Sequence, residues 1–445
     1  MQSKLFFIAL LLSVLLSCSQ DDPMSSTAEA DRDFALELVQ SFQWGGSQDD
    51  ALTAIIANRN GLFTMLGHTA SIDGDINTKN RPGNDYWMLQ ASPQGFVQHN
   101  RTYGGSGDDI GTALLETEAG NLVLAGYSQS ADGDASRNAG FHDHWFLEVN
   151  ASAEVNWERS YGFAGHDHAY SIVQTQDGGL FTAGFLDVTA SEGQGNETVS
   201  AKHGVGEFWG QKLDAAGNLE WRRYFGGSNN DRAYKVLQAP DGGFVLFGLS
   251  ESEDFDISDS KGTYDFWVIK ISATGDLLWE RNYGGSEIDR AYAATAAPDG
   301  GYLIAGQSFS ADGDKNTHLG NSDAWLIKIN GQGELLWEHS YGGSEFDYAA
   351  GIAPLGNDFM VVGNSRSTDG DLSNNSGEND LWIYRIDATG ELLWSASYGG
   401  SGIDQATDVA VLPDGTVGVT GFLGNDALPG TSAHGGQDAV LLIFQ

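Results

Sequence analysis

The chain has 445 residues, of which 61 are acidic and 22 are basic, and its formal charge at pH 7 is −39. A surplus of this size repels nucleic acid and anionic membrane surfaces, so neither is an expected partner, whereas it favours solubility and the attraction of cations. The 60 glycines are dispersed and accompany 12 tryptophans, which indicates tight turns and aromatic packing rather than a low-complexity chain.

The first residues have the features of a targeting segment. Lys4 precedes the apolar run LFFIALLLSVLL. The run leads into LLSC, whose last residue, Cys18, is the only cysteine of the chain. The pattern resembles the signal of bacterial lipoproteins, which implies cleavage of residues 1–17 as a signal peptide and lipidation of Cys18 by palmitate-type chains. The lipid would then be the only attachment to a membrane. A lone buried cysteine is the alternative interpretation.

The sequence SQDDP follows Cys18 directly. Its acidic pair is similar to the surface-export tag of Bacteroidetes lipoproteins, and this resemblance implies a lipid-anchored protein of the bacterial outer membrane that is displayed on the cell surface. An ordinary polar tether is the alternative. We expect residues 18–35 to comprise the lipidated cysteine and a flexible tether.

Seven related copies of the motif YGGSEIDRAY divide the rest of the chain, and such regular self-similarity is the main indicator of a repeat architecture. Their spacings are 59, 58, 64, 58, 58 and 57 residues. The copies begin at Gly45, Gly104, Gly162, Gly226, Gly284, Gly342 and Gly399.

Each unit has the pattern of four antiparallel strands. In the fourth unit the sequence predicts strands at 233–239, 244–250, 265–272 and 277–283, with the tight turns PDGG and ATGD and one long polar loop between them. Repeated four-stranded units are typical of the blades of a β-propeller. The predicted fold class is therefore all-β.

The two ends of the chain predict how the units assemble. The last unit stops at its third strand, DAVLLIFQ, and the missing fourth strand is LELVQSF at residues 36–42. This offset by one strand is explained if the N-terminal strand completes the last blade and closes a ring without free sheet edges. An open array would need polar caps instead. We predict one seven-bladed β-propeller over residues 36–445.

The consensus YGGSxxDxA…DGGxxxxGxSxSxDGD…DxWxxKIxxxGxLxWE resembles the repeats of secreted propeller lipoproteins common in Bacteroidetes. The resemblance covers residues 36–445. It implies a propeller fold and an envelope location, and it implies little about activity.

Successive strands reverse direction, so the tight turns lie on one face of the ring, and the long loops share the opposite face, the loop face, with the GGSxxD connections. The first strand of each unit is expected to be innermost, which would place the aspartate of GGSxxD around the mouth of the central channel. These carboxylates form either a cation-attracting rim or acceptors for backbone N–H groups of their own turns, and their recurrence favours the second interpretation. They are Asp50, Asp109, Asp167, Asp231, Asp289, Asp347 and Asp404.

A second acidic motif, DGD, lies in four of the long loops and is followed by an aspartate before the third strand. Clustered carboxylates suit calcium, which takes six to eight oxygen ligands. The spacing matches neither an EF-hand nor a DxDxDG loop, and solvated Asp-Gly turns are the favoured alternative. The proposed calcium ligands are Asp312, Asp314, Asp323, Asp369, Asp371 and Asp380, and the related positions are Asp73, Asp75, Asp85, Asp132, Asp134 and Asp143.

The third unit departs from the consensus, with YGFAGHDHAY at its start and a long loop, 187–206, that lacks DGD. Blade two ends its own long loop in FHDHW, so two HDH triplets lie on either side of one blade junction. Alternate residues of an extended chain point the same way, and imidazoles with carboxylates suit zinc or another transition metal. Exposed, mutually hydrogen-bonded loop residues are the alternative. The predicted metal ligands are His142, His144, His166, Asp167 and His203.

Blades three to five carry a cationic or ionisable residue directly after the GGSxxD aspartate and a tyrosine two residues later. Arginine beside aromatic rings is a common way to hold a sugar acid, a sulfate or a carboxylate. Ion pairs between each arginine and the neighbouring aspartates are the alternative. The predicted ligand-binding residues are His168, Tyr170, Arg232, Tyr234, Arg290 and Tyr292.

Tryptophans recur in register in the third and fourth strands, which predicts packing between blades rather than a sugar-binding platform. The sequence contains no GxSxG elbow, HExxH, P-loop or Rossmann fingerprint. The turn DATGELLW resembles the sialidase Asp-box SxDxGxxW but has one extra residue between Gly390 and Trp394.

Three functional hypotheses remain open. The first is a carbohydrate-binding or protein-binding module of the cell envelope, whose glycan or extracellular protein ligand contacts the loop face with the help of a cation. The second is a hydrolase or lyase that acts on polysaccharide at blades two to five, with paired carboxylates or the histidines as acid and base. The third is a structural subunit of an envelope complex. Calcium and zinc are the candidate cofactors, and no organic cofactor is expected.

Overall fold

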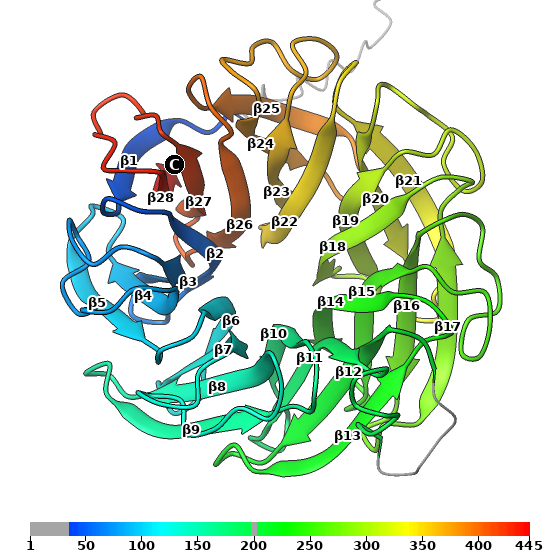
Figure 1. Cartoon of the computed structure of the whole chain (residues 1–445). Coiled ribbons are helices and arrows are strands. Elements are labelled where there is room, and N and C mark those ends of the chain that lie inside the picture. The colour runs from blue at the N-terminus through cyan, green and yellow to red at the C-terminus, as the bar shows by residue number, and fades with distance from the viewer. Residues whose placement is uncertain (1–34, 197–202) are drawn as a thin grey trace, which may run out of the picture. The chain divides into compact units, whose positions relative to one another are not determined.

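The computed structural model describes residues 35–196 and 203–445, and the expected signal peptide, Cys18 and most of the expected tether lie outside the described residues. The described part forms seven four-stranded antiparallel sheets around a central channel, so the predicted seven-bladed β-propeller is confirmed (Figure 1). Among the described residues, no helix is both long enough and apolar enough to cross a membrane.

Each blade contributes one strand to each of four concentric positions. The innermost strands are β2 (Asp50–Ala57), β6 (Asp109–Glu116), β10 (Asp167–Gln174), β14 (Asp231–Gln238), β18 (Asp289–Ala296), β22 (Asp347–Leu355) and β26 (Gln405–Val411). The second strands are β3 (Phe63–Thr69), β7 (Leu122–Ser128), β11 (Leu180–Asp187), β15 (Phe244–Ser250), β19 (Tyr302–Ser308), β23 (Asp358–Ser365) and β27 (Val417–Gly424). The third strands are β4 (Asp85–Ala91), β8 (Asp143–Val149), β12 (Gly206–Leu213), β16 (Asp265–Ile271), β20 (Asp323–Ile329), β24 (Asp380–Ile386) and β28 (Gln437–Phe444). The outermost strands are β5 (Val97–Tyr103), β9 (Val155–Tyr161), β13 (Leu219–Phe225), β17 (Leu277–Tyr283), β21 (Leu335–Tyr341), β25 (Leu392–Tyr398) and β1 (Leu38–Trp44).

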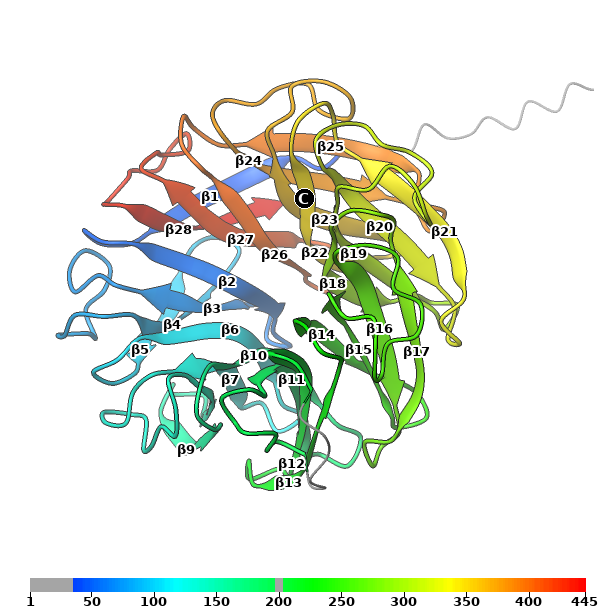
Figure 2. The same ribbon diagram turned by 45° about the vertical axis from the view of Figure 1, so that its right-hand side comes forward.

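The ring is closed by the N-terminal strand. β1 pairs antiparallel with β28, with Phe42 opposite Leu441 and Trp44 opposite Ala439, and the last sheet has the order β1-β28-β27-β26. Both views show β1 in blue beside β28 in red (Figures 1 and 2). The prediction of closure is therefore confirmed, although the strand lies two residues later than the predicted 36–42.

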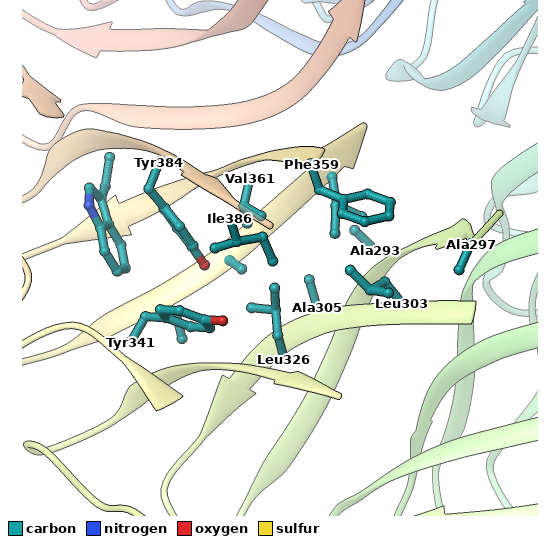
Figure 3. Close-up of a cluster of buried hydrophobic side chains, with 14 of the residues drawn as sticks. Ala293, Ala297, Leu303, Ala305, Leu326, Tyr341, Phe359, Val361, Tyr384 and Ile386 are labelled. Carbon is teal, nitrogen blue, oxygen red and sulfur yellow. The ribbon is translucent and has the colours of Figure 1, made fainter. Parts of the chain in front are cut away.

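The core consists of apolar side chains between neighbouring blades. The six third-strand tryptophans are fully buried. Where an aromatic residue precedes such a tryptophan, it packs on the tryptophan of the next blade, as in Tyr86 with Trp145 (ring centroids 4.6 Å apart) and Phe208 with Trp267 (4.4 Å). Between blades five and six, Leu303 and Leu326 face side chains from β23 and β24 (Figure 3). The tryptophans thus serve inter-blade packing, as the sequence predicts.

The aspartate of GGSxxD is fully buried in all seven blades. Each of these carboxylates accepts the backbone N–H of the residue four positions earlier, at 2.6–2.8 Å. Asp347 also accepts the hydroxyls of Ser365 and Ser367, the latter at 2.8 Å. These groups therefore bind the connection between blades to the inner strands, which confirms the interpretation as backbone acceptors over that of a cation-attracting rim.

Blade three carries Glu207 where the other blades have an aspartate at the start of the third strand. Gly204 N–H donates to one carboxyl oxygen at 2.9 Å, while the other has no hydrogen-bond partner among the described residues. Nδ1 of His203 lies 3.7 Å from that second oxygen. Burial, reinforced by the charge of Asp231, raises the pKa of Glu207 to about 10. The group is therefore protonated and uncharged at neutral pH.

The substitution Asp347→Ala is expected to lower the free energy of unfolding by about 2–4 kcal/mol, because it leaves one N–H and two hydroxyls without their buried acceptor. Urea denaturation followed by tryptophan fluorescence measures this loss. The control is Asp369→Ala, which removes a carboxylate from the exposed loop of the same blade, where it accepts Ser344 N–H at 2.8 Å. Equal effects of the two substitutions would contradict the assigned role of the buried aspartate.

The substitution Glu207→Gln is expected to stabilise the protein increasingly as the pH rises. The pKa of Glu207 is higher in the folded chain (about 10) than its ordinary 4.5, so its contribution to stability is complete only below pH 4.5 and is lost toward pH 10. Glutamine keeps the shape without titrating. The variant should gain up to about 1.4 kcal/mol per pH unit over the wild type between pH 5 and pH 9 in urea unfolding. The matched control is Glu287→Gln, which replaces an exposed glutamate, and a Glu207→Gln effect that stays constant with pH would contradict the assignment.

Candidate functional site

A β-bulge in every innermost strand determines which side chains line the channel. The ladder between the first and second strands skips one residue in each blade, and a bulge of this kind re-aims the side chain of the extra residue. The inner strand passes so close to the second strand that a Cβ on Gly248 would overlap the carbonyl oxygen of Arg232, and glycine occupies the equivalent position in all seven blades. The skipped residues are Thr53, Thr112, Tyr170, Tyr234, Tyr292, Ala350 and Thr407.

The bulged residues divide the channel into two sectors. In blades one, two and seven they are threonines whose hydroxyls donate to a carbonyl of the next blade, as Thr53 does to Gly111 at 2.7 Å. In blades three to five they are tyrosines. A cavity of about 150 Å³ lies in the channel between the two sectors, with Tyr234, Lys235 and Asp408 in its lining. The bulge therefore directs the predicted tyrosines into the channel, which the sequence pattern alone does not show.

The predicted arginines and tyrosines of blades four and five come together at the mouth of the channel. A pocket of about 200 Å³ is lined by Arg232, Tyr234, Leu249, Tyr264, Arg290 and Tyr292, and we call it the Arg–Tyr pocket. The guanidinium of Arg232 lies 4.8 Å from the ring centre of Phe185, and that of Arg290 lies 5.4 Å from the ring centre of Tyr264. Stacking on aromatic rings thus positions both cations.

Neither of the two guanidiniums forms an ion pair within the described part of the chain. The buried aspartates beside them are engaged by the backbone, and the carboxylate of Glu251 accepts instead from the Tyr264 hydroxyl at 3.0 Å and from Asn230 at 3.1 Å. The alternative interpretation, in which each arginine pairs with the neighbouring aspartate, is therefore wrong. Two cationic groups remain available at the channel mouth.

The tyrosines form a continuous arc along the channel wall. The ring centres of Tyr170 and Tyr234 are 5.1 Å apart, those of Tyr234 and Tyr292 are 5.5 Å apart, and those of Tyr292 and Tyr348 are 6.0 Å apart. Burial raises the pKa of Tyr348 to about 12 and also raises the pKa values of Tyr170 and Tyr292. These phenols stay protonated at neutral pH and can donate hydrogen bonds.

His142, His166 and His168 form a compact group on the loop face at the junction of blades two and three. Nδ1 of His142 lies 2.9 Å from Nδ1 of His166 and 3.1 Å from Nε2 of His168. This is the one set of three potential ligand residues in the described ranges, 35–196 and 203–445, whose ligand atoms all lie within 4.8 Å of one another. We call it the histidine triad. His168, which the sequence assigned to the ligand-binding set, is thus a member of this group.

The other three predicted metal ligands do not join the triad. His144 lies in the position held by Tyr86 and Phe208 in other blades, and its ring packs on Trp209 of the next blade at 4.6 Å. Asp167 is one of the seven buried backbone acceptors. His203 stacks on Phe255 of the blade-four loop at 4.4 Å. The repeat itself contained the signal for the first two, since their aligned positions are structural in every blade.

Two of the triad histidines are uncharged at neutral pH. Burial and the neighbouring His166 lower the pKa of His142 to about 4. Burial and the other histidines around it lower the pKa of His168 to about 2. At neutral pH each of these two rings therefore has one nitrogen without a proton, and its lone pair is available.

The proposed calcium ligands serve the backbone of the GGS connections. In blades five and six the first aspartate of DGD, Asp312 or Asp369, accepts the serine N–H at 2.7 or 2.8 Å, respectively. The second, Asp314 or Asp371, accepts a glycine N–H at 3.2 or 2.9 Å. Asp323 pairs with Lys315 at 2.6 Å, and Asp380 accepts Ser376 N–H at 2.8 Å. Within the described ranges these carboxylates do not converge on a common point. The structure thus shows these carboxylates as backbone acceptors and an ion-pair partner, and calcium binding stays a prediction.

Sequence reasoning missed several residues of the channel. Lys235 and Asp408 follow the bulges of blades four and seven and line the same cavity, where burial raises the pKa of Asp408 and Lys235 partly offsets that rise. Tyr264 ends a long loop and contributes a wall of the Arg–Tyr pocket. The repeat alignment could have indicated Lys235 and Asp408, because five of the seven blades have alanine, glycine or serine at that position.

No family model matches the chain. An alignment over 163 positions shows 29% identity to the regulatory protein FlaEY of Caulobacter vibrioides; it covers 34% of this chain and 17% of the length of that protein. Among solved structures, the chain is similar to the WD40 β-propeller domain of Doa1, with 12% identity, a TM-score of 0.50, and coverage of 92% of this chain and 97% of that one. It is also similar to BamB from Moraxella catarrhalis, with 12% identity, a TM-score of 0.41, and coverage of 92% and 100%. At 12% identity the likeness to the Doa1 domain shows a β-propeller fold and nothing finer.

Proposed function

We propose that the protein is a binding module whose Arg–Tyr pocket takes an acidic saccharide, such as a uronic acid or a sulfated sugar. The observation that carries this proposal is the presence of two guanidiniums, Arg232 and Arg290, that form no ion pair with any described residue and lie beside a wall of tyrosines. In a chain with a formal charge of −39, cations left without carboxylate partners are available for an anionic ligand.

The chemistry of the pocket matches the groups of an acidic sugar. A guanidinium donates paired hydrogen bonds to a carboxylate or sulfate, and these charge-assisted bonds are stronger than neutral ones. The phenol hydroxyls of Tyr234 and Tyr292 supply further donors for sugar hydroxyls, and their rings offer apolar surface. The volume of about 200 Å³ suits roughly one sugar residue. Tyr234 and Tyr292 also line the channel cavity below, so a longer ligand extends along the same wall.

We also propose that the protein is a lipoprotein of the outer membrane that presents the loop face outside the cell. This part of the proposal is supported by the sequence around Cys18, which lies outside the described residues. A surface location would expose the Arg–Tyr pocket to extracellular polysaccharide, while the lipid alone attaches the protein to the membrane.

The substitution Arg290→Ala is expected to weaken saccharide binding by at least about 10-fold, because it removes a charge-assisted contact worth about 1.5–3 kcal/mol. A glycan array selects the ligand, and calorimetric titration in EDTA measures the affinity without any metal. The matched control Arg281→Ala removes a guanidinium that lies 5.9 Å from the ring centre of Trp279 on the outermost strand of blade four. Equal affinity of the Arg290 variant and wild type would refute the pocket, and absence of any bound glycan would favour a protein ligand. Titration with added Ca²⁺ tests the cation-assisted form.

The substitution Cys18→Ala is expected to move the protein from the membrane fraction to the soluble fraction and to abolish incorporation of labelled palmitate, because the acylated side chain is lost. Fractionation and metabolic labelling in a bacterial host measure both effects. Protease accessibility on intact cells then tests surface display. A Cys18 variant that stays in the membrane fraction would show that another part of the chain attaches it.

A further inference from the structure

The histidine triad lies outside the Arg–Tyr pocket and has the features of a metal site. We propose that His142, His166 and His168 bind one divalent transition-metal ion of the zinc class on the loop face of the propeller. The proposal rests on the geometry of the triad and not on the saccharide proposal, because the two sites use different residues.

The distances between the nitrogens are close to those that a shared metal ion requires. With Zn–N bonds of about 2.0–2.1 Å, two neighbouring nitrogens on one ion are about 2.8–3.0 Å apart in octahedral coordination and about 3.3–3.4 Å apart in tetrahedral coordination. Two pairs of nitrogens in the triad are 2.9 and 3.1 Å apart, and all three ligand atoms lie within 4.8 Å of one another. The rings are inclined to one another by 60°, 60° and 77°, so they surround a point rather than stack. Little movement is needed to accommodate an ion.

The backbone holds the triad in place before any ion binds. His142 and His166 pair as an isolated parallel bridge, with His142 N–H donating to Gly165 at 3.0 Å and Asp167 N–H donating to the His142 carbonyl at 2.8 Å. Asp167 is held in place as a buried acceptor of a backbone N–H. This in turn positions His168, the residue that follows it. The ligands therefore come from two segments joined by hydrogen bonds, and binding does not have to order a flexible loop.

The neighbouring side chains orient His168. Its ring stacks on Tyr127 with centroids 3.8 Å apart and an interplanar angle of 9°. Its Nδ1 lies 3.0 Å from the hydroxyl of Tyr170, and an Nδ1–H that donates to this oxygen leaves the lone pair of Nε2 directed at the triad. An outer hydrogen bond that fixes the tautomer in this way is a regular companion of histidine ligands in metal sites.

Three imidazole nitrogens that face one another are not satisfied by protons alone. Nδ1 of His142 contacts both other nitrogens, and one N–H can be directed well at only one of them. A metal ion accepts all three lone pairs at once. Three protein ligands also leave a coordination position free, and the exposed His166 places this side of the triad toward solvent.

The test uses the full mature protein without a polyhistidine tag, stripped with EDTA and then freed of the chelator. Calorimetric titration with ZnCl₂ is expected to show one bound ion per chain, and addition of Co²⁺ is expected to give visible d–d absorption. His166→Ala should weaken zinc binding by at least about 10-fold and remove the cobalt bands, since one of three ligands is lost. His166 is exposed, so its replacement is not expected to disturb the fold, and circular dichroism checks this. The control His339→Ala removes an exposed histidine of the outermost strand in blade five and should bind zinc as the wild type does.

Each outcome decides the proposal. Failure of the wild type to bind zinc or cobalt, or equal affinity of the His166 variant and wild type, would overturn it. Loss of binding in His203→Ala with retention in His166→Ala would move the site to the enlarged loop of blade three and would also overturn it. Arg290→Ala should retain full zinc binding, so a failure of the saccharide proposal and a failure of the metal proposal give different results.

Discussion

A buried carboxylate at the start of each blade is the interaction on which the loop face depends. In every blade it accepts a backbone N–H from the connection that precedes it, and it thereby fixes the crossing from the outermost strand of one blade to the innermost strand of the next. The residue that follows the carboxylate is consequently held at the channel mouth. His168, Arg232 and Arg290 all occupy this position, and the tyrosines lie two residues further along. The candidate sites are therefore attached to the most regular part of the repeat.

The scaffold is nearly sevenfold in structure but not in chemistry. Blades one and two have Ala51 and Ile110 where blades four and five have arginines, so one sector of the mouth is cationic in a strongly acidic protein. The net charge opposes the approach of an anion from a distance, yet charges are screened over about 8 Å at physiological ionic strength. Within that range an acidic ligand would contact the phenols and the two guanidiniums, which form no ion pair in the described part of the chain. Affinity for an acidic ligand should therefore arise from direct contact rather than from long-range attraction.

The repeat period, the strand pattern and the offset of the termini sufficed to predict the architecture, because packing between blades imposes the same residues at the same positions. Of the six predicted ligand-binding residues, four line one pocket, whereas His168 and Tyr170 do not; the four are Arg232, Tyr234, Arg290 and Tyr292. The sequence assigned the histidines less well: His144 fills an inter-blade packing position, and Asp167 serves the backbone, so neither alternation nor proximity in sequence reveals their orientation. The sequence pattern did not reveal the bulges, because the extra residue shifts the inward–outward alternation by only one position within strands of seven to nine residues. Contacts between loops distant in sequence, such as His203 with Phe255, are equally absent from the pattern.

The bulge shared by all seven innermost strands has a consequence for how such a protein diversifies. The skipped residue takes no part in the ladder with the second strand, so its side chain can be exchanged without altering the pairing of the sheet. Threonine, alanine and tyrosine are all accommodated there within this one molecule. The channel of the propeller is thus lined by seven positions whose residues can change independently. Selection can alter the channel lining one blade at a time while the fold of the seven blades stays the same.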